Sequence, residues 1–283
     1  MKAKIIDGRA LAEKTCDAIV ERIEALRKKG VTPKLAVILI GNNPASEVYV
    51  SNKGKKAKQL GIDVVIEHHE NGATQEEIID MIERFNRDES VHGILVQLPL
   101  PEDVDATLVL SHIDPRKDVD GLHTYNAGAL STGREGFIPC TPKGVIELIK
   151  STGIDICGKR AVVVGRSNLV GKPTAILMLR NDATVTICHS KTEKLGEITK
   201  DADILIVAVG KCNLISSDMV KKDAVVIDVG QSKVDGKWRG DVDFENVAEI
   251  ASHITPVPGG VGPMTITMLM DNTVEAAEKS LNG

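Results

Sequence analysis

Short apolar segments alternate with amphipathic ones along this chain, and that alternation restricts its possible folds more than any other feature. Residues 34–40 read KLAVILI between Pro33 and Gly41, a pattern typical of a strand buried on both faces. Residues 64–68 and 93–100 are similar, and amphipathic segments separate the three. Strands that alternate with helices in this way predict a parallel α/β sheet.

Helices are expected before the first strand at residues 10–29, between the second and third at 75–87, and at 142–151, which leads into the second half. A further helix contains Lys53, with Ser46 as its expected N-cap and Gly61 as its expected C-cap. A serine side chain can accept a hydrogen bond from the first turn, and glycine tolerates the left-handed conformation that often ends a helix.

A second alternating set follows residue 140, with expected strands at 160–165, 184–189, 203–209, 224–230 and 253–257 and a last helix at about 264–280. Residues 111–142 interrupt the two sets with glycines and prolines, so loops that face a site are expected there. A chain of 283 residues exceeds one ordinary core. We predict an α/β protein of two domains, 1–139 and 140–283, with the last helix packed back onto the first domain.

Composition excludes several classes of protein. The net charge of −5 argues against general affinity for nucleic acid. Five scattered cysteines without a C-x-x-C pair indicate reduced thiols, and Cys140 is expected to be structural because no His partner is indicated. Neither an apolar signal region nor a membrane span is present. The reduced thiols and the missing signal and membrane segments favour a cytoplasmic protein. Asp118 and Asp120 lack further ligands, so we expect no metal.

A glycine turn joins the first strand of the second set to a helix in VVVGRSNLVGKP. Five residues separate Gly165 from Gly171, so the turn departs from G-x-G-x-x-G, and Pro173 rules out a P-loop. Strand, glycine turn and helix are nevertheless the arrangement in which dinucleotide folds bind pyrophosphate. A plain connecting loop is the alternative.

The end of the next strand favours a nucleotide with an extra phosphate. An NAD site carries an acid there that holds the ribose 2′-hydroxyl. Here His189, Ser190 and Lys191 follow the strand, and no acid occurs before Glu193. Together with Arg166 in the glycine turn, these residues suit a 2′-phosphate, so we predict a Rossmann-type NADP-binding domain.

The stretch YVSNKGKKAK, residues 49–58, leaves the role of Lys53 open. Tyr49 and Lys53 lie four residues apart and share one face of a helix. Gly54 costs a helix about 1 kcal/mol relative to alanine, so either another segment approaches the backbone closely or the helix bends. The neighbouring lysines fit a solvated basic face equally well.

Seven motifs stand in order along nearly the whole chain: YVSNK, VQLPLP, KDVDG, PCTPKG, VVVGRSNLVGKP, CHSKT and PVPGGVGPMT. Together they resemble the bifunctional methylenetetrahydrofolate dehydrogenase/methenyltetrahydrofolate cyclohydrolase family. The resemblance implies NADP-dependent oxidation of 5,10-methylenetetrahydrofolate to the methenyl form, and hydrolysis of that form to 10-formyltetrahydrofolate. It also implies a catalytic domain, a Rossmann-type NADP-binding domain and a folate cleft between them, in a homodimer of one-carbon metabolism that serves purine, methionine and histidine biosynthesis.

The resemblance also implies roles for single residues. Lys53 is the catalytic lysine, Tyr49 stacks on the folate, and Gln97 hydrogen-bonds the lysine and tunes its proton affinity. Asp120 grips the amino-pyrimidine end of the pterin. The other implied substrate-binding residues are Val96, Leu98, Pro258, Gly259, Gly260, Val261 and Gly262, and the implied cofactor-binding residues are Gly165, Arg166, Ser167, Ser190 and Gln231.

Two of these assignments have alternatives. The glycines of PGGVGP fit a tight turn as well as a ligand's approach. Gln231 stands where the family usually has a smaller or apolar residue, which leaves the fine cofactor preference open.

Chemistry places a condition on Lys53. Hydration of a methenyl cation needs proton transfer, and a lysine takes part only if some of it is neutral near pH 7. Its pKa, about 10.4 in water, must therefore fall substantially. Burial can lower a lysine pKa by up to roughly 3–5 units, and a neutral Gln97 adds no countercharge. We expect Lys53 to be buried beside Gln97.

Two other functions fit parts of the sequence. One is a different NADP dehydrogenase with a catalytic lysine, such as the shikimate dehydrogenase type, against which VQLPLP and PGGVGPMT speak. The other is a non-catalytic NADP-binding module, which the presence of Tyr49, Lys53, Gln97 and Asp120 disfavours.

Overall fold

The computed structural model describes residues 2–281 and divides into two compact units. Unit 1 consists of Met1–Lys14 and Thr141–Thr265, and unit 2 of Thr15–Cys140 and Ile266–Gly283. Each unit has its own parallel sheet, so the predicted two-domain α/β class is confirmed. Residues 1–14 fall with unit 1, whereas the sequence placed them in the first domain, because strand β1 (Lys4–Ile5) pairs with β11 (His253–Ile254).

Unit 2 is built on a three-stranded parallel sheet in the order β3-β2-β4. Its strands are β2 (Lys34–Ile40), β3 (Asp63–His69) and β4 (Gly93–Val96). Central β2 is buried from Leu35 to Ile40, which explains its unbroken apolar sequence. Strand β4 ends before the predicted residue 100, because Pro99 and Pro101 have no N–H to donate to a neighbouring strand.

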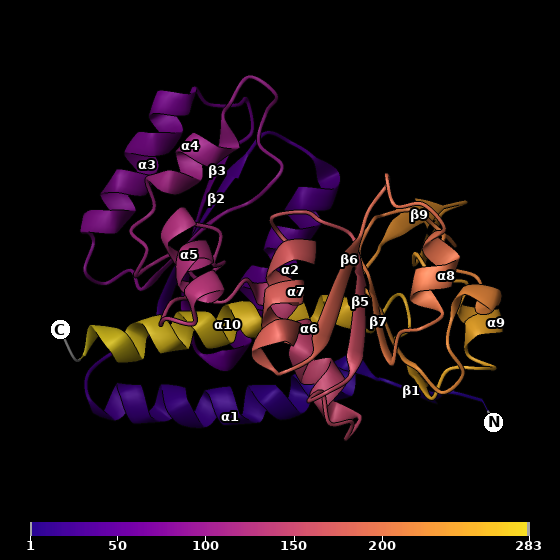
Figure 1. Cartoon of the computed structure of the whole chain (residues 1–283). Coiled ribbons are helices and arrows are strands. Elements are labelled where there is room, and N and C mark those ends of the chain that lie inside the picture. Colours follow the sequence, from indigo (N-terminus) through magenta and orange to yellow (C-terminus); the bar gives the residue numbers. More distant parts are fainter. Residues whose placement is uncertain (1, 282–283) are drawn as a thin grey trace. The chain divides into compact units, whose positions relative to one another are not determined.

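Helices cover both faces of the β2 sheet (Figure 1). Helix α2 (Pro44–Leu60) contacts β2 and β3. Helices α3 (Gln75–Arg87) and α4 (Ala106–Ser111) enclose the other core with Ala36, Ile38 and Ile40 of β2. Helix α3 occupies the range that the sequence predicted, and the Thr74–Glu77 capping box begins it.

The N-cap predicted for α2 is wrong. Asn43, not Ser46, caps the helix, and its side chain accepts hydrogen bonds from Ala45 N at 2.9 Å and Ser46 N at 3.3 Å. Pro44 follows at the first helical position, where its missing N–H has no cost. Gly61 ends the helix at φ +88°, as predicted.

In unit 2, residues 15–28 of helix α1 (Gly8–Lys28) and residues 266–280 of helix α10 (Val261–Ser280) lie side by side (Figure 1). Arg22 of α1 joins them through an ion pair with Asp271 and two hydrogen bonds to Glu278, at 2.9 and 2.7 Å. These carboxylates hold the pKa of Arg22 above its ordinary value. Helix α5 (Thr124–Thr132) occupies part of the segment in which only loops were expected.

Unit 1 is a six-stranded parallel sheet in the order β1-β11-β8-β7-β5-β6. Its inner strands are β11, β8 (Val225–Asp228), β7 (Ile204–Val207) and β5 (Arg160–Val164), and β1 and β6 (Thr184–Cys188) lie at the two edges. Figure 1 shows α6 (Cys140–Ser151) and α7 (Gly171–Arg180) on one side of this sheet, and α8 (Leu195–Thr199) and α9 (Phe244–Val247) on the other. This is a doubly wound arrangement, as a Rossmann-type domain requires.

Several short elements of unit 1 were not predicted. Strands β9 (Ser232–Val234) and β10 (Lys237–Arg239) form an antiparallel hairpin. Asp235 and Gly236 turn it with positive φ angles, +50° and +75°. An Asp-Gly pair between short strands is a strong hairpin signal, so the sequence contained the information. A short 3₁₀ helix (Ser217–Met219) also lies in this unit.

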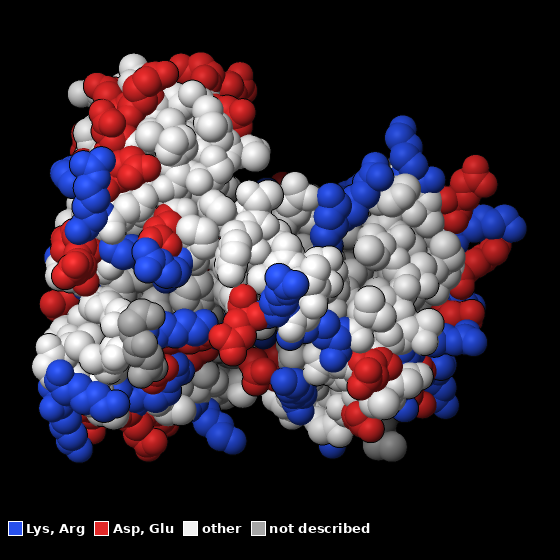
Figure 2. Space-filling model, turned by 60° about the vertical axis from the view of Figure 1, so that its left-hand side comes forward, with Lys and Arg blue, Asp and Glu red and all other residues white. Residues whose placement is uncertain are grey.

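Charged side chains of both signs are spread over the face shown in Figure 2, and acidic ones gather at the top left of that view. Among residues 2–281, no helix combines the length and the apolarity that a bilayer crossing would need.

Shortening Ile82 should destabilise unit 2. Ile82 lies in the core between α3 and the sheet and is fully buried. Ile82→Ala is expected to lower the free energy of unfolding by about 2–5 kcal/mol, measured by urea denaturation. Ile79→Ala, at a half-buried position of the same helix, is the control and should cost less. Equal losses for the two variants would contradict this description of the core.

Candidate active site

Lys53 is buried on α2, and its amine faces a neutral partner. The residue is 7% exposed. Its Nζ donates a hydrogen bond to Oε1 of Gln97 at 3.0 Å and lies 5.4 Å from the centre of the Tyr49 ring. Gln97 is held in turn, because its Nε2 donates to the Leu98 carbonyl at 2.6 Å. The structure thus brings Tyr49, Lys53 and Gln97 together.

Burial governs the electrostatics of this amine. Desolvation lowers the pKa of Lys53, while the negative charge of Asp120 and the Cys140 thiol act in the opposite direction. Desolvation is the larger effect, since within residues 2–281 no carboxylate accepts a hydrogen bond from Nζ and the accepting amide is uncharged. A lowered pKa is what the predicted catalytic role of Lys53 requires.

Gly54 lies where helix α2 packs against strand β3. A Cβ at this position would lie 3.3 Å from Cδ1 of Ile66 on β3. The helix therefore approaches the sheet closely at Gly54 and seats the neighbouring Lys53 at depth. Of the two explanations, close approach is the one that the packing supports.

Asp118 and Asp120 have different environments. Asp118 is 1% exposed, and its Oδ2 accepts hydrogen bonds from His123 N and Asn126 Nδ2, both at 2.8 Å. It therefore organises the loop, although burial raises its pKa. Asp120 is only partly buried and acts on Lys53 through its charge. Of the two acids, Asp120 is the one open to a ligand.

Other residues near Lys53 are structural or border the site. Cys140 is buried, and its thiol donates to the Val119 carbonyl at 3.3 Å. Val96 ends β4 inside the core, and Leu98 is half-buried beyond Gln97. No cluster of three or more His, Cys, Asp or Glu side chains suited to a metal occurs among residues 2–281.

The glycine turn of unit 1 depends on close backbone approach. Gly165 has φ +130°, and a Cβ there would lie 2.4 Å from the Ala208 carbonyl oxygen. A Cβ on Gly171 would lie 2.2 Å from the Gly165 carbonyl oxygen, so the first residue of α7 packs directly on the turn. In the G-x-G-x-x-G fingerprint, glycines provide a tight turn and close packing of the helix, and Gly165 and Gly171 do the same here at a different spacing. The turn therefore fits a dinucleotide cofactor.

The remaining predicted cofactor residues lie at the carboxyl ends of neighbouring strands. Ser167 Oγ accepts hydrogen bonds from Val170 N and Gly171 N, at 3.1 and 3.4 Å. Arg166 is exposed beside it after β5, and Ser190 is exposed after β6. In open α/β sheets this edge is where ligands bind.

Gln231 follows β8 and approaches the loop 258–262. Its Nε2 lies 3.1 Å from the point that a Cβ on Gly262 would occupy. In the loop itself, Gly259 has φ +109°, and Gly260 and Val261 are buried. A Cβ on Gly8 would lie 1.8 Å from the Gly260 carbonyl oxygen. Pro258 is exposed. The positive φ of Gly259 suits a tight turn, whereas close approach of the backbone requires glycine at positions 8 and 260.

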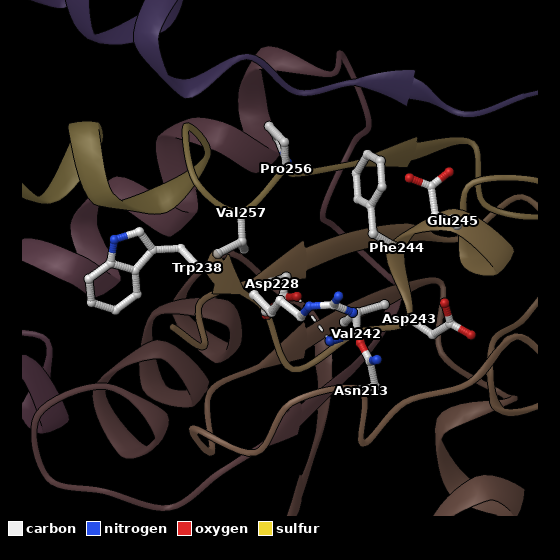
Figure 3. Close-up of a pocket in the computed structure, with 11 residues that line it drawn as sticks. Asn213, Asp228, Trp238, Val242, Asp243, Phe244, Glu245, Pro256 and Val257 are labelled. Carbon is white, nitrogen blue, oxygen red and sulfur yellow. Dashed lines mark hydrogen bonds between the residues drawn. The ribbon is translucent and has the colours of Figure 1, made fainter. Parts of the chain in front are cut away.

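A separate pocket of about 350 Å³ lies elsewhere in unit 1 (Figure 3). Its lining includes Asp228, Trp238, Phe244 and Val257. None of the residues predicted to bind folate or cofactor is among those that line it. Sequence patterns had not singled out this pocket.

Comparisons with known proteins agree over the whole chain. Residues 6–120 match the model for "Tetrahydrofolate dehydrogenase/cyclohydrolase, catalytic domain", and residues 139–281 match the "NAD(P)-binding domain" of the same family. The "Bifunctional protein FolD" of Halalkalibacterium halodurans is 54% identical over 279 residues, which cover 99% of this chain and 100% of the relative.

Solved structures give the same result. The bifunctional FolD enzyme from Campylobacter jejuni superposes with a TM-score of 0.96 at 49% identity, covering 98% of this chain and 99% of that one. The Trypanosoma brucei enzyme, complexed with NADP cofactor and inhibitor, has a TM-score of 0.95 at 39% identity, with 100% of both chains covered.

These findings identify a two-domain α/β protein with an NAD(P)-binding domain. The chain belongs to the tetrahydrofolate dehydrogenase/cyclohydrolase family, so the predicted family is confirmed. Shikimate dehydrogenase from Aquifex aeolicus shares the fold alone, with a TM-score of 0.53 at 16% identity over 89% of this chain and 98% of that one.

The charges around Lys53 make a paired prediction. Gln97→Glu places a carboxylate where Oε1 now accepts at 3.0 Å, so the pKa of Lys53 should rise. Asp120→Asn removes a charge that raises this pKa, so it should fall further. An NMR titration of the Lys53 side chain measures both, with Glu102→Gln on the exposed surface as the control. Shifts of the same sign in the two variants would refute this electrostatic account.

Proposed function

We propose that this chain oxidises 5,10-methylenetetrahydrofolate to the methenyl form with NADP and hydrolyses that form to 10-formyltetrahydrofolate, with Lys53 serving both steps. The observation that carries the proposal is the buried Lys53 amine, 3.0 Å from Oε1 of the neutral Gln97. Family membership over the whole chain supports the same pair of reactions.

The first step needs positioning more than chemistry from the protein. NADP, when bound, supplies the nicotinamide that accepts the hydride. The residues of the chain hold the reactants in a reactive geometry, which can contribute much of a rate enhancement. We assign Tyr49 to stacking on the folate and Val96 and Leu98 to lining its site. The loop 258–262 is assigned to binding folate through its backbone.

The second step moves protons at one carbon. Water adds to the methenyl carbon and gives up a proton, and the neutral amine of Lys53 can accept it. The ammonium so formed can return the proton to the folate nitrogen as the carbon–nitrogen bond breaks. A lowered pKa favours both roles at neutral pH. The hydroxyl proton of the adduct leaves to solvent as the formyl carbonyl forms, so the cationic substrate and water give a neutral product and one released proton.

Asp120 links substrate binding to this chemistry. We assign it to the amino-pyrimidine end of the pterin, whose N–H groups suit a carboxylate. A ligand that hydrogen-bonds Asp120 would weaken the larger of the two charge effects, those of Asp120 and Cys140, that raise the pKa of Lys53. Bound folate would also remove water from the amine. Both effects favour the neutral amine when substrate is present.

The cofactor assignment rests on Gly165, Arg166, Ser167 and Ser190, with Gln231 nearby. Arg166 is exposed at the glycine turn, where its guanidinium can pair with a 2′-phosphate. No acid follows β6 before Glu193, so a group that would repel that phosphate is missing from this loop. We therefore favour NADP over NAD.

The cellular setting stays a proposal as well. We expect a cytoplasmic homodimer of one-carbon metabolism that supplies formyl and methenyl units to purine, methionine and histidine biosynthesis. Net charge of −5 and the acidic region in Figure 2 give little support for binding nucleic acid. Unit 2 is proposed as the folate domain and unit 1, which includes residues 1–14, as the NADP domain.

Removing the amine should abolish hydration. Lys53→Met is expected to lower cyclohydrolase turnover by about a hundredfold or more, assayed as decay of methenyltetrahydrofolate absorbance. Folding stability should be unchanged or slightly higher, because a buried polar group is lost. Lys55→Met, exposed on the same helix, is the control. Wild-type hydration by Lys53→Met would refute the role of Lys53, whereas absence of turnover in the wild-type protein would favour a cofactor-binding module without catalysis.

Arg166 should discriminate between the two nicotinamide cofactors. Arg166→Ala is expected to raise the Kd for NADP about tenfold and that for NAD by about twofold or less, since only NADP carries the 2′-phosphate. Calorimetric titration with each cofactor measures this. Arg180→Ala, at the other end of α7 and exposed, is the control. Equal losses for the two cofactors would undo the 2′-phosphate argument.

A further inference from the structure

Two buried acids of unit 1 have no role in the chemistry above. Asp228, the last residue of β8, is 3% exposed, and Asp241 is 0% exposed. Burial raises the pKa of Asp228 to about 7 even though three backbone N–H donors oppose the shift. Keeping a carboxyl group here is therefore costly, and the contacts of the pair show what it holds in place.

Asp228 fixes Asp241. Its Oδ1 accepts from Asp241 N at 2.9 Å and Gly230 N at 3.1 Å, and its Oδ2 accepts from Val242 N at 2.9 Å. Figure 3 shows Asp228 and Val242 joined in this way at the pocket. Two consecutive N–H groups of the 241–242 segment thus bind one carboxyl group, which fixes the direction of the chain.

Asp241 in turn holds the end of β7. Its Oδ2 accepts from Val209 N at 2.7 Å and Gly210 N at 3.0 Å. Gly210 has φ +68°, so the chain turns sharply just beyond the strand. The other oxygen, Oδ1, is buried and has no hydrogen-bond partner among the described residues. Oδ2 of Asp241 therefore accepts both of these hydrogen bonds.

The backbone that Asp241 holds supports the glycine turn. Ala208, directly before Val209, donates its N–H to the Val164 carbonyl at 2.8 Å. Its own carbonyl oxygen lies 2.4 Å from where a Cβ on Gly165 would be. A displacement of residues 208–210 would therefore displace Gly165, which has no side chain to cushion the contact.

Two glycines make room for the acids. A Cβ on Gly230 would lie 2.0 Å from Cγ of Asp241, and one on Gly240 would lie 1.9 Å from Oδ2 of Asp228. Any larger residue at either position would force the carboxyl groups from their donors. The arrangement is thus built around the two side chains, from β8 through residues 240–242 to the end of β7.

We propose that Asp241 is a positioning residue for the dinucleotide, which holds the β7 end and through it the glycine turn, while Asp228 holds Asp241. The inference rests on the proposed function, because it concerns the cofactor of that reaction. The reaction itself supplies an internal control, since hydrolysis of methenyltetrahydrofolate consumes no NADP. A defect confined to the cofactor turn should spare this hydrolysis, whereas general loss of structure should not.

The test compares Asp241→Ala and Asp241→Asn with wild type, with Asp243→Asn as the control. Asp243 lies two residues away, and its carboxylate accepts from the exposed Asn246 side chain. Asp241→Ala should raise the Kd and KM for NADP about tenfold or more, because charge-assisted hydrogen bonds are lost. Asparagine keeps one acceptor oxygen, so Asp241→Asn should show a smaller rise. Cyclohydrolase kcat/KM should stay within about twofold of wild type in both.

Other outcomes overturn the inference. Unchanged NADP binding in Asp241→Ala would do so, as would a parallel fall of both activities, which indicates a structural role only. If Asp241→Ala does not fold, Asp241→Asn decides by the same criterion of selective loss. Wild-type protein without cyclohydrolase activity would instead contradict the proposed function. Wild type with both activities but no selective effect in the variants contradicts this inference alone.

Discussion

The free-energy cost of placing an ammonium group away from water is the constraint on which the active site depends. Lys53 is buried at 7% exposure, and its hydrogen-bond acceptor is an uncharged amide. A carboxylate in that position would stabilise the cation and remove the advantage of burial. The surrounding structure serves this end, because Gly54 lets α2 approach β3 closely enough to keep the amine at depth.

The two units meet their chemical demands by different physical means. Unit 2 tunes a proton affinity, and its important quantities are burial and charge around one side chain. Unit 1 offers backbone to a dinucleotide, and its important quantities are distances between main-chain atoms at Gly165, Gly171 and Ala208. A substitution in unit 2 acts mainly through a pKa, whereas one in unit 1 acts through displacement of a turn.

The parallel sheets could be predicted from the sequence because β2 and its neighbours are apolar segments that alternate with helices. The family could be predicted because seven motifs occur in order along the chain. Sequence reasoning named the wrong N-cap for α2. Asn43 and Ser46 are both favourable N-cap residues, and the choice between them depends on where the helix begins, which is at Pro44. The same reasoning also passed over the pair Asp228 and Asp241. Two isolated acids carry no local pattern, and their importance arises from backbone donors that folding brings to them.

The doubly tethered Gln97 has a consequence for stereochemistry. Its nitrogen donates to the Leu98 carbonyl, so rotating the amide by half a turn would set Oε1 against that carbonyl oxygen, acceptor against acceptor. Lys53 must then give one of its hydrogens to Gln97 whenever the amine is uncharged. The unshared electron pair on Nζ is left to point away from that contact, so the direction of its reactivity is built into the chain before any folate arrives.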